Sequence, residues 1–261
     1  MSRGKNITSE VAGFWDDVAI NKSQFISNLW TSHPLVKLRI NQLISGDANT
    51  DPWQYMLRFL DEQGVVFPVA SLASLGCGTG ELERGLSKYG TAMKYTGLDI
   101  SPASIRGAIE ESQAMAGAEF KYAVADLNKP QLEPREFDVI ICNGSVHHIE
   151  NLEALAESIE LSLVPGGWLV LDEFVGPKRF QWTDRQLDLI NRALKTLPEE
   201  FRTDRSGNVK QAVFRETIEH MIDVDPSEAV RSDEIMGIFA KRFNLALAYR
   251  ELSNAMVLLC P

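Results

Sequence analysis

Apolar and polar positions between residues 69 and 175 follow a pattern that predicts parallel β-strands separated by helices. Short apolar runs with the length of buried strands lie at residues 69–75, 94–99, 120–125, 137–142 and 168–172. Segments compatible with helices lie between them, at residues 81–88, 101–116 and 151–163. This β-α-β alternation predicts a parallel sheet with helices on both faces.

Helical periodicity precedes the first predicted strand. Helices are expected over residues 11–30, 35–44 and 53–63. His33-Pro34 ends the first of these segments, because the residue before a proline is pushed out of the helical region. Asp51-Pro52 has the order of an N-cap followed by proline at the first helical position. We therefore expect a helical cap region at the N-terminal side of the sheet.

The regular alternation stops after residue 175. Helix-like segments follow at residues 184–197, 209–222 and 227–239, and residues 243–250 and 255–260 resemble a closing antiparallel hairpin. A helical insertion of roughly 60 residues is long for a plain connection, so we expect it to form part of a lid over the carboxyl ends of the strands. The predicted organisation is an N-terminal helical cap (1–64), a core (65–175), a helical lid (176–240) and a hairpin completing the core (241–261).

Charge and cysteine usage restrict the class of partner. The 261-residue chain has a net charge of −10 and no long basic run, which argues against nucleic acid and against an anionic membrane surface. No apolar run approaches the length of a membrane span, and no signal-peptide pattern follows Met1. The three scattered cysteines Cys77, Cys142 and Cys260 show no zinc spacing or disulfide framework and fit a reducing cytoplasm. The oligomeric state stays open.

Residues suited to nucleoside binding follow four of the predicted strands. The first strand ends in the glycine turn Gly76-Cys-Gly-Thr-Gly80, the second in Asp99, the third in Asp126-Leu127 and the fourth in Asn143. The carboxyl ends of parallel strands meet at one edge of the sheet, so these residues are expected to converge. There an acid after the second strand can accept hydrogen bonds from both ribose hydroxyls, and Asp126-Leu127 can meet an adenine.

Simpler interpretations of the same residues remain open at this point. Asp99 can merely cap the helix that begins near Ser101. A nucleophilic Cys77 is disfavoured because no His–Asp pattern activates it. A nicotinamide enzyme is disfavoured by Glu81, which stands where a dinucleotide fingerprint has its third glycine.

Five segments together resemble the class I S-adenosylmethionine-dependent methyltransferases: Leu75–Gly80, Gly97–Ser101, Ala125–Leu127, Cys142–Ile149 and Leu163–Val170. The resemblance implies a doubly wound, Rossmann-like, seven-stranded α/β sheet with an antiparallel last strand. It also implies S-adenosyl-L-methionine as cofactor, with the glycines at its methionine end, Asp99 at the ribose, Asp126 and Leu127 at the adenine and Asn143 near the amino group. The implied cofactor-binding residues are Gly76, Cys77, Gly78, Gly80, Asp99, Ile100, Asp126, Leu127 and Asn143.

The catalytic candidates lie after the fourth and fifth predicted strands. His147 and His148 are general-base candidates because histidine titrates near neutral pH, although either can instead order the loop. Glu173 is a further candidate, and a buried structural acid is an equally good interpretation of it. No metal is expected, since Asn143-Gly-Ser145 stands where metal-dependent relatives place acidic ligands.

The sequence does not identify the methyl acceptor. We expect a small-molecule or glycan acceptor methylated at oxygen. The alternatives are N-methylation of a small metabolite or protein, and a silent domain that binds the cofactor for regulation. Basic residues concentrate in the expected lid and indicate either a solvated face or a grip on a phosphate or carboxylate of the acceptor. They are Lys178, Arg179, Arg185, Arg202 and Arg205.

Overall fold

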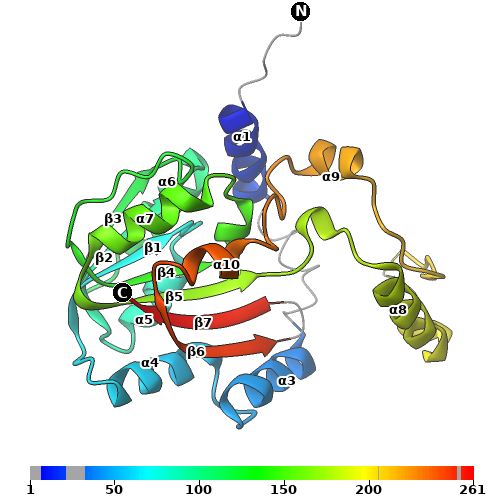
Figure 1. Cartoon of the computed structure of the whole chain (residues 1–261), viewed down its shortest axis with the longest axis horizontal. Helices are drawn as coiled ribbons and strands as arrows, with labels where there is room; N and C mark the ends of the chain where they lie inside the picture. The colour runs from blue at the N-terminus through cyan, green and yellow to red at the C-terminus, as the bar shows by residue number, and fades with distance from the viewer. Residues whose placement is uncertain (1–6, 22–32, 205, 252–253) are drawn as a thin grey trace, which may run out of the picture.

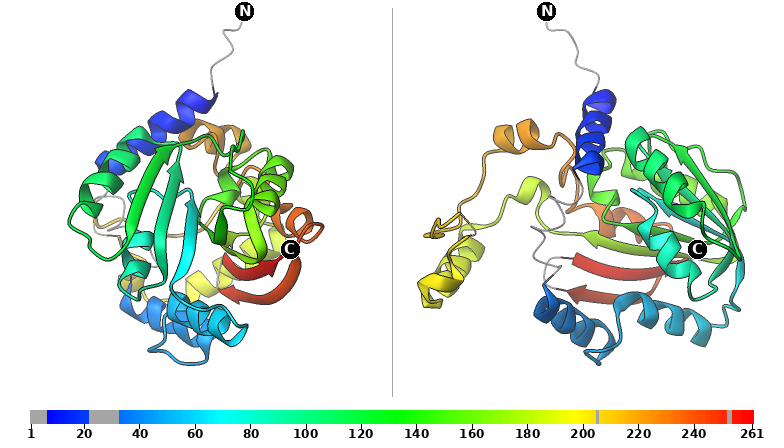
Figure 2. Two further views of the ribbon diagram at one scale, coloured as in Figure 1. Left: turned by 90° about the vertical axis from the view of Figure 1, so that its left-hand side faces the viewer. Right: turned by 180° about the vertical axis from the view of Figure 1, so that it is seen from behind.

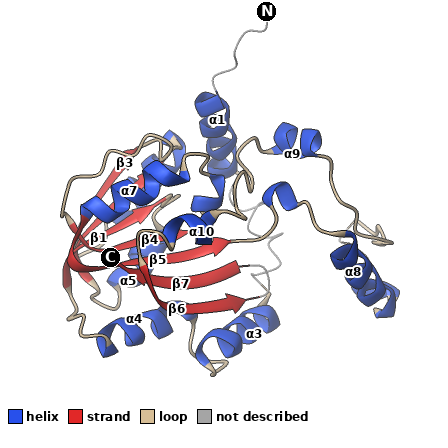
Figure 3. Cartoon of the chain, in the orientation of Figure 1, coloured by secondary structure: helices blue, strands red, loops and turns tan. Residues whose placement is uncertain are grey.

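A seven-stranded sheet in the order β3-β2-β1-β4-β5-β7-β6 forms the centre of the computed structural model (Figures 1 and 3). The structure describes residues 7–21, 33–204, 206–251 and 254–261. Strand β7 pairs antiparallel with both β5 and β6, and the remaining strands run in one direction. This arrangement confirms the predicted fold class. The strands are β1 (Val69–Leu75), β2 (Ala92–Asp99), β3 (Glu119–Val124), β4 (Phe137–Asn143), β5 (Leu163–Phe174), β6 (Asn244–Glu251) and β7 (Asn254–Cys260).

Helices cover both faces of the sheet and bury separate apolar clusters against it. One face packs on α3 (Pro34–Ser45), α4 (Pro52–Glu62) and α5 (Glu81–Ser87), through residues such as Met56 and Leu60. The other face packs on α7 (Leu152–Ser162) and α10 (Ile235–Phe239). Helix α6 (Pro102–Ser112) packs on β2 and β3. The layers leave the carboxyl ends of β1, β2 and β4 at one edge.

Local capping signals set the helix starts that the sequence predicts. The Asp51 carboxylate accepts a hydrogen bond from the backbone N–H of Gln54, and Pro52 is the first residue of α4. The Ser101 hydroxyl oxygen accepts from the N–H of Ser104 at the start of α6. Such caps satisfy donors that the first helical turn leaves unpaired. The predicted helix 11–30 begins earlier, as α1 (Ile7–Ile20), and its residues 22–30 lie outside the described ones.

Two predicted helices are shorter in the structure. Only Ile218–Val224 (α9) of the segment around 209–222 is helical, because the Asn191 side chain holds both the N–H and the C=O of Val213 at 2.7 and 2.9 Å. These bonds satisfy the Val213 backbone outside a helix. Only α10 forms within 227–239, because the Asp225 carboxylate accepts from the N–H of Ser227 and opens a turn there.

The N-terminal helices and the insertion are placed differently from the expected lid. Helix α1 lies against α6 at the carboxyl edge, whereas α3 and α4 lie on a sheet face (Figure 2). Helix α8 (Asp184–Thr196) stretches away from the sheet and contains no buried residue. The insertion returns to the edge only at residues 225–232. No described helix is both long and apolar enough to cross a bilayer. The domain boundaries stay predictions.

Candidate cofactor and active site

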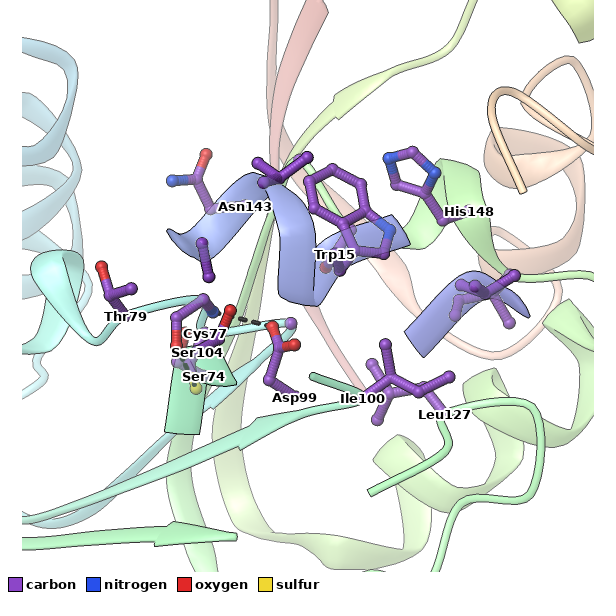
Figure 4. Close-up of a pocket in the computed structure, with 18 of the residues that line it drawn as sticks. Trp15, Ser74, Cys77, Thr79, Asp99, Ile100, Ser104, Leu127, Asn143 and His148 are labelled. Atoms are coloured by element: carbon purple, nitrogen blue, oxygen red, sulfur yellow. Dashed lines mark hydrogen bonds between the residues drawn. The ribbon is translucent and has the colours of Figure 1, made fainter. Parts of the chain in front are cut away.

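A cavity of about 360 Å³ opens at the carboxyl ends of β1, β2 and β4 (Figure 4). Its size lies within the range of small-molecule sites. The predicted cofactor-binding residues Gly76, Cys77, Gly78, Asp99, Ile100, Asp126, Leu127 and Asn143 all line it. Gly80 does not, and neither do His147 and Glu173, whereas His148 does.

Asp99 joins the ends of two strands. One carboxylate oxygen accepts from the N–H of Gly78 at 2.8 Å, and the other accepts from the N–H of Ser101 at 2.9 Å. Burial raises the pKa of this carboxyl, against the lowering effect of these hydrogen bonds. Since a carboxylate offers about four lone-pair sites, Asp99 can still accept two further hydrogen bonds from a ligand in the cavity.

The glycine turn packs closely against other residues at Gly76 and Gly80 and leaves open space at Gly78. Gly76 has φ +77°, and a Cβ there would lie 2.2 Å from the Cβ of Ser145. A Cβ on Gly80 would lie 2.6 Å from the Tyr122 hydroxyl, so Gly80 serves packing. Gly78 has φ +53° and no atom within 4 Å of a Cβ position. Burial raises the pKa of the Cys77 thiol well above its usual value, which leaves this thiol a poor nucleophile.

Helix α1 closes the outer side of the cavity. Its residues Val11, Trp15, Val18 and Ala19 line the cavity wall. The Asp16 carboxylate accepts from the Ser101 hydroxyl at 2.6 Å and from the N–H of Ala103 at 2.8 Å, and Thr8 donates to Asp126 at 3.3 Å. The Trp15 ring meets the His148 ring edge-on at 5.0 Å. These hydrogen bonds and ring contacts hold α1 over the predicted cofactor residues.

Glu173 lies beneath the loop that carries the two histidines. It is fully buried, and one oxygen accepts from the N–H groups of Ser145 and Val146 at 2.9 and 2.8 Å. Its other oxygen lies 2.7 Å from Nδ1 of His147. Glu173 therefore positions the loop and orients His147, rather than facing the cavity as a base.

Residues 225–228 pack against both histidines. The Ser227 hydroxyl lies 3.1 Å from Nδ1 of His148 and donates to the Asp225 carboxylate at 2.7 Å. Glu228 Oε1 lies 3.7 Å from Nε2 of His147. Asp225, Ser227 and Glu228 are not among the site residues predicted from the sequence, because nothing in their local spacing links them to His147 and His148.

Two of the basic residues in the expected lid hold loops. The Arg179 guanidinium donates to the carbonyl oxygens of Pro226 and Glu228 at 2.8 and 3.0 Å. The Arg202 guanidinium donates to the Leu197 carbonyl at 3.1 Å. Arg205 lies outside the described residues. Arg179 thus fixes the segment that contacts His148.

The chain matches known methyltransferase sequences over part of its length. Residues 73–169 match a family model described as a methyltransferase domain. A demethylmenaquinone methyltransferase from Tropheryma whipplei is 30% identical over 106 residues, which are 41% of this chain and 42% of that protein. The hybrid PKS-NRPS synthetase apdA from Emericella nidulans is 32% identical over 120 residues, 42% of this chain and 3% of the synthetase. The chain covers less than half of each of these two relatives.

Solved structures share the fold. An S-adenosylmethionine-dependent methyltransferase from Mesorhizobium loti has a TM-score of 0.51 at 17% identity, covering 77% of this chain and 96% of that chain. A protein from Pyrococcus horikoshii OT3 has a TM-score of 0.51 at 18% identity, covering 85% and 97%. The shared fold and the matched family model both indicate a methyltransferase. Residues 73–169 therefore form a methyltransferase domain, within the class I S-adenosylmethionine-dependent methyltransferase fold. The cofactor of proteins with this domain and fold is S-adenosylmethionine.

The two histidines of the methyltransferase domain have opposite electrostatic environments. Burial lowers the pKa of His147, but its hydrogen bond to Glu173 and the charges of Glu173, Glu228 and Asp225 outweigh burial and raise it. Burial and the charge of His147 hold the pKa of His148 well below its usual value. Groups whose pKa values are pushed apart in this way are suited to separate acid and base roles.

The hydrogen-bond network assigns the proton of neutral His148. The Ser227 hydroxyl has one proton, which it donates to Asp225, so it accepts a hydrogen bond from Nδ1–H of His148. The lone pair of the neutral ring therefore lies on Nε2. This is the tautomer that a general base at the cavity wall requires.

Glu173→Gln is expected to destabilise the methyltransferase domain by about 3 kcal/mol, because it breaks a buried charged network. His147 has a raised folded-state pKa, so its contribution to stability is present below its unfolded pKa of about 6.5 and is lost as the pH rises through the folded value. Urea unfolding of wild type and Glu173→Gln at pH 6 and pH 9 measures the loss of stability in the variant and how the stability of wild type depends on the His147 charge. A variant with unchanged stability at pH 6 would contradict the role of Glu173.

His147, His148 and Glu228 also resemble a metal site within the described residues. One ligand atom from each lies within 4.8 Å of the others. We expect methyl transfer to be unaffected by dialysis against EDTA, because the Nε2 lone pair of His148 is then used to accept a proton and not to bind a metal. A loss of activity that zinc restores would instead assign these side chains to a metal.

Proposed function

We propose that this chain methylates a hydroxyl group of a small-molecule or glycan acceptor, using S-adenosylmethionine and the general base His148. In the proposed cofactor pose the ribose hydroxyls bind Asp99, and the adenine lies between Asp126 and Leu127. The methionine part lies over Gly76 and Gly78. The open space at Gly78 and the unused lone pairs of Asp99 support this pose.

The observation that carries the oxygen acceptor is the environment of His148. Transfer from a sulfonium is an in-line displacement, so the protein has to align acceptor oxygen, methyl carbon and sulfur. The acceptor hydroxyl also has to lose its proton. His148 lines the cavity, holds Nδ1–H toward Ser227 and presents Nε2 as the acceptor of that proton.

Two further features support a small, ring-containing acceptor. Half-buried Phe180 and Trp182 lie parallel at 6.1 Å beside Phe174, whose ring is 6.3 Å from that of His147. Aromatic faces of this kind stack on sugars and other rings. The Tropheryma relative is named for a small-molecule acceptor, demethylmenaquinone. The cytoplasmic location expected from the cysteines is part of the same proposal.

Methyl-labelled S-adenosylmethionine tests this proposal with a panel of sugars, nucleotide sugars, phenols and amines. The expected result is label in an ether product that withstands mild base, with transfer abolished by boiling the protein. Label on nitrogen would replace the hydroxyl acceptor by an amine. Cofactor binding without transfer to any acceptor would favour the silent regulatory domain.

A further inference from the structure

Glu83, in the first turn of α5, has a carboxylate that is buried without a partner. The side chain is fully buried, and neither oxygen has a hydrogen-bond partner among the described residues. Such burial of an unpaired carboxylate is costly, so a charged Glu83 requires a cation nearby.

The neighbouring protein groups do not supply that cation. The Arg84 guanidinium is directed to the Thr79 carbonyl and forms an ion pair with Glu111. The other groups that act on Glu83 are its own backbone N–H and the Ser74 hydroxyl, which lie near without hydrogen-bond geometry, and the Asp99 carboxyl; none of them is a cation. Glu83 in turn raises the pKa values of Cys77 and Tyr122, which burial has already raised, to about 12 for Tyr122. Both therefore stay neutral near pH 7.

The cavity lies next to these groups. Ser74, Cys77 and Asp99 line it, and each of these three residues interacts with the Glu83 carboxyl, which does not itself line the cavity. In the proposed pose the methionine part of the cofactor lies over this turn. S-adenosylmethionine has a net charge of +1 because of its sulfonium, whereas the product S-adenosylhomocysteine is neutral overall.

We infer that Glu83 selects the charge of the cofactor, so that the site holds the cationic S-adenosylmethionine more tightly than the neutral product. This inference rests on the proposed function and concerns its cofactor half. The carboxylate attracts the sulfonium while the methyl group is present. Transfer of the methyl group removes the positive charge and with it the attraction, which favours product release.

Burial, together with Asp99, raises the pKa of Glu83 to about 7 against the opposing effects of its own backbone N–H, Ser74 and Arg84. The preference for the cation is therefore weak at pH 6 and strong at pH 8. Calorimetry on the full chain measures the dissociation constants of S-adenosylmethionine, S-adenosylhomocysteine and sinefungin, whose amine replaces the sulfonium. The affinity ratio of S-adenosylmethionine to S-adenosylhomocysteine is expected to rise about tenfold over this range, with sinefungin following S-adenosylmethionine.

Glu83→Gln keeps the shape of the side chain and removes its charge. The affinity ratio of S-adenosylmethionine to S-adenosylhomocysteine in this variant is therefore expected to stay constant between pH 6 and pH 8. Glu110→Gln, the same change at an exposed position of α6, is expected to behave as wild type. A wild-type ratio that does not change with pH would overturn the inference, even if Glu83→Gln fails to fold. Failure of all three ligands to bind the folded protein would instead remove the proposed cofactor site.

The stability of the ligand-free protein gives a second readout. Because the folded-state pKa of Glu83 is raised, its neutral form stabilises the protein at low pH, and that contribution is lost as the pH rises from about 4.5 to about 7. The melting temperature of wild type is therefore expected to fall relative to Glu83→Gln over this interval. Parallel melting curves would contradict a buried carboxyl that titrates there.

Discussion

Asp99→Ala is expected to weaken S-adenosylmethionine binding at least about 100-fold. The change removes two charge-assisted hydrogen bonds to the ribose, each worth about 1.5–3 kcal/mol, and tenfold in affinity corresponds to about 1.4 kcal/mol. It also removes the acceptor of the N–H groups of Gly78 and Ser101, which shape the cavity floor. Calorimetric titration of the purified variant measures the effect.

The matched control is Asp61→Ala, which removes an exposed aspartate at the end of α4. Its affinity for the cofactor is expected to stay within threefold of wild type. Circular dichroism of both variants establishes that they are folded. An Asp99→Ala protein that is folded and binds within threefold of wild type would show that the ribose does not bind there.

His148→Gln is expected to lower kcat by about 10²- to 10⁴-fold, the usual range for loss of a general base. Cofactor affinity is expected to change by less than threefold, because the proposed cofactor contacts come from other residues. His220→Gln is the control, since His220 is an exposed histidine of α9. A kcat within threefold of wild type in the His148 variant would contradict its role as base.

The pH profile and the Ser227 contact test the same base independently. Because burial and the charge of His147 hold the pKa of His148 well below its usual value, kcat should stay constant from pH 8 down to pH 6 and fall only in more acidic solution. Ser227→Ala removes the partner of Nδ1 and is expected to lower kcat about tenfold. An acidic limb near pH 6.5 would contradict the environment described for His148.

Local signals account for what the sequence predicts well. The glycine turn, Asp99 and Asp126 each lie at or just after the end of a short strand, so the topology of a parallel sheet brings them to one edge. The starts of α4 and α6 are set by side chains that bond to the N–H groups of the first turn. These interactions span a few residues and are visible in the sequence.

The features of the site that could not be predicted from the sequence depend on contacts between segments far apart in the chain. Ser227 meets His148 from 79 residues away, and Thr8 meets Asp126 from 118 residues away. The alternation of side chains along the strand does not say which way Glu173 faces. In the structure Glu173 is buried under the loop that carries the two histidines. Glu83 has an ordinary place on a predicted helix, and only the packing around it shows that its carboxylate has no partner.

A crystal structure with S-adenosylhomocysteine tests the central proposal most directly. The expected result places the ribose hydroxyls within hydrogen-bond distance of the Asp99 carboxylate, the adenine beside Asp126 and Leu127, and the sulfur on the side facing His148. The cofactor bound elsewhere, or with its ribose away from Asp99, would contradict the proposed site.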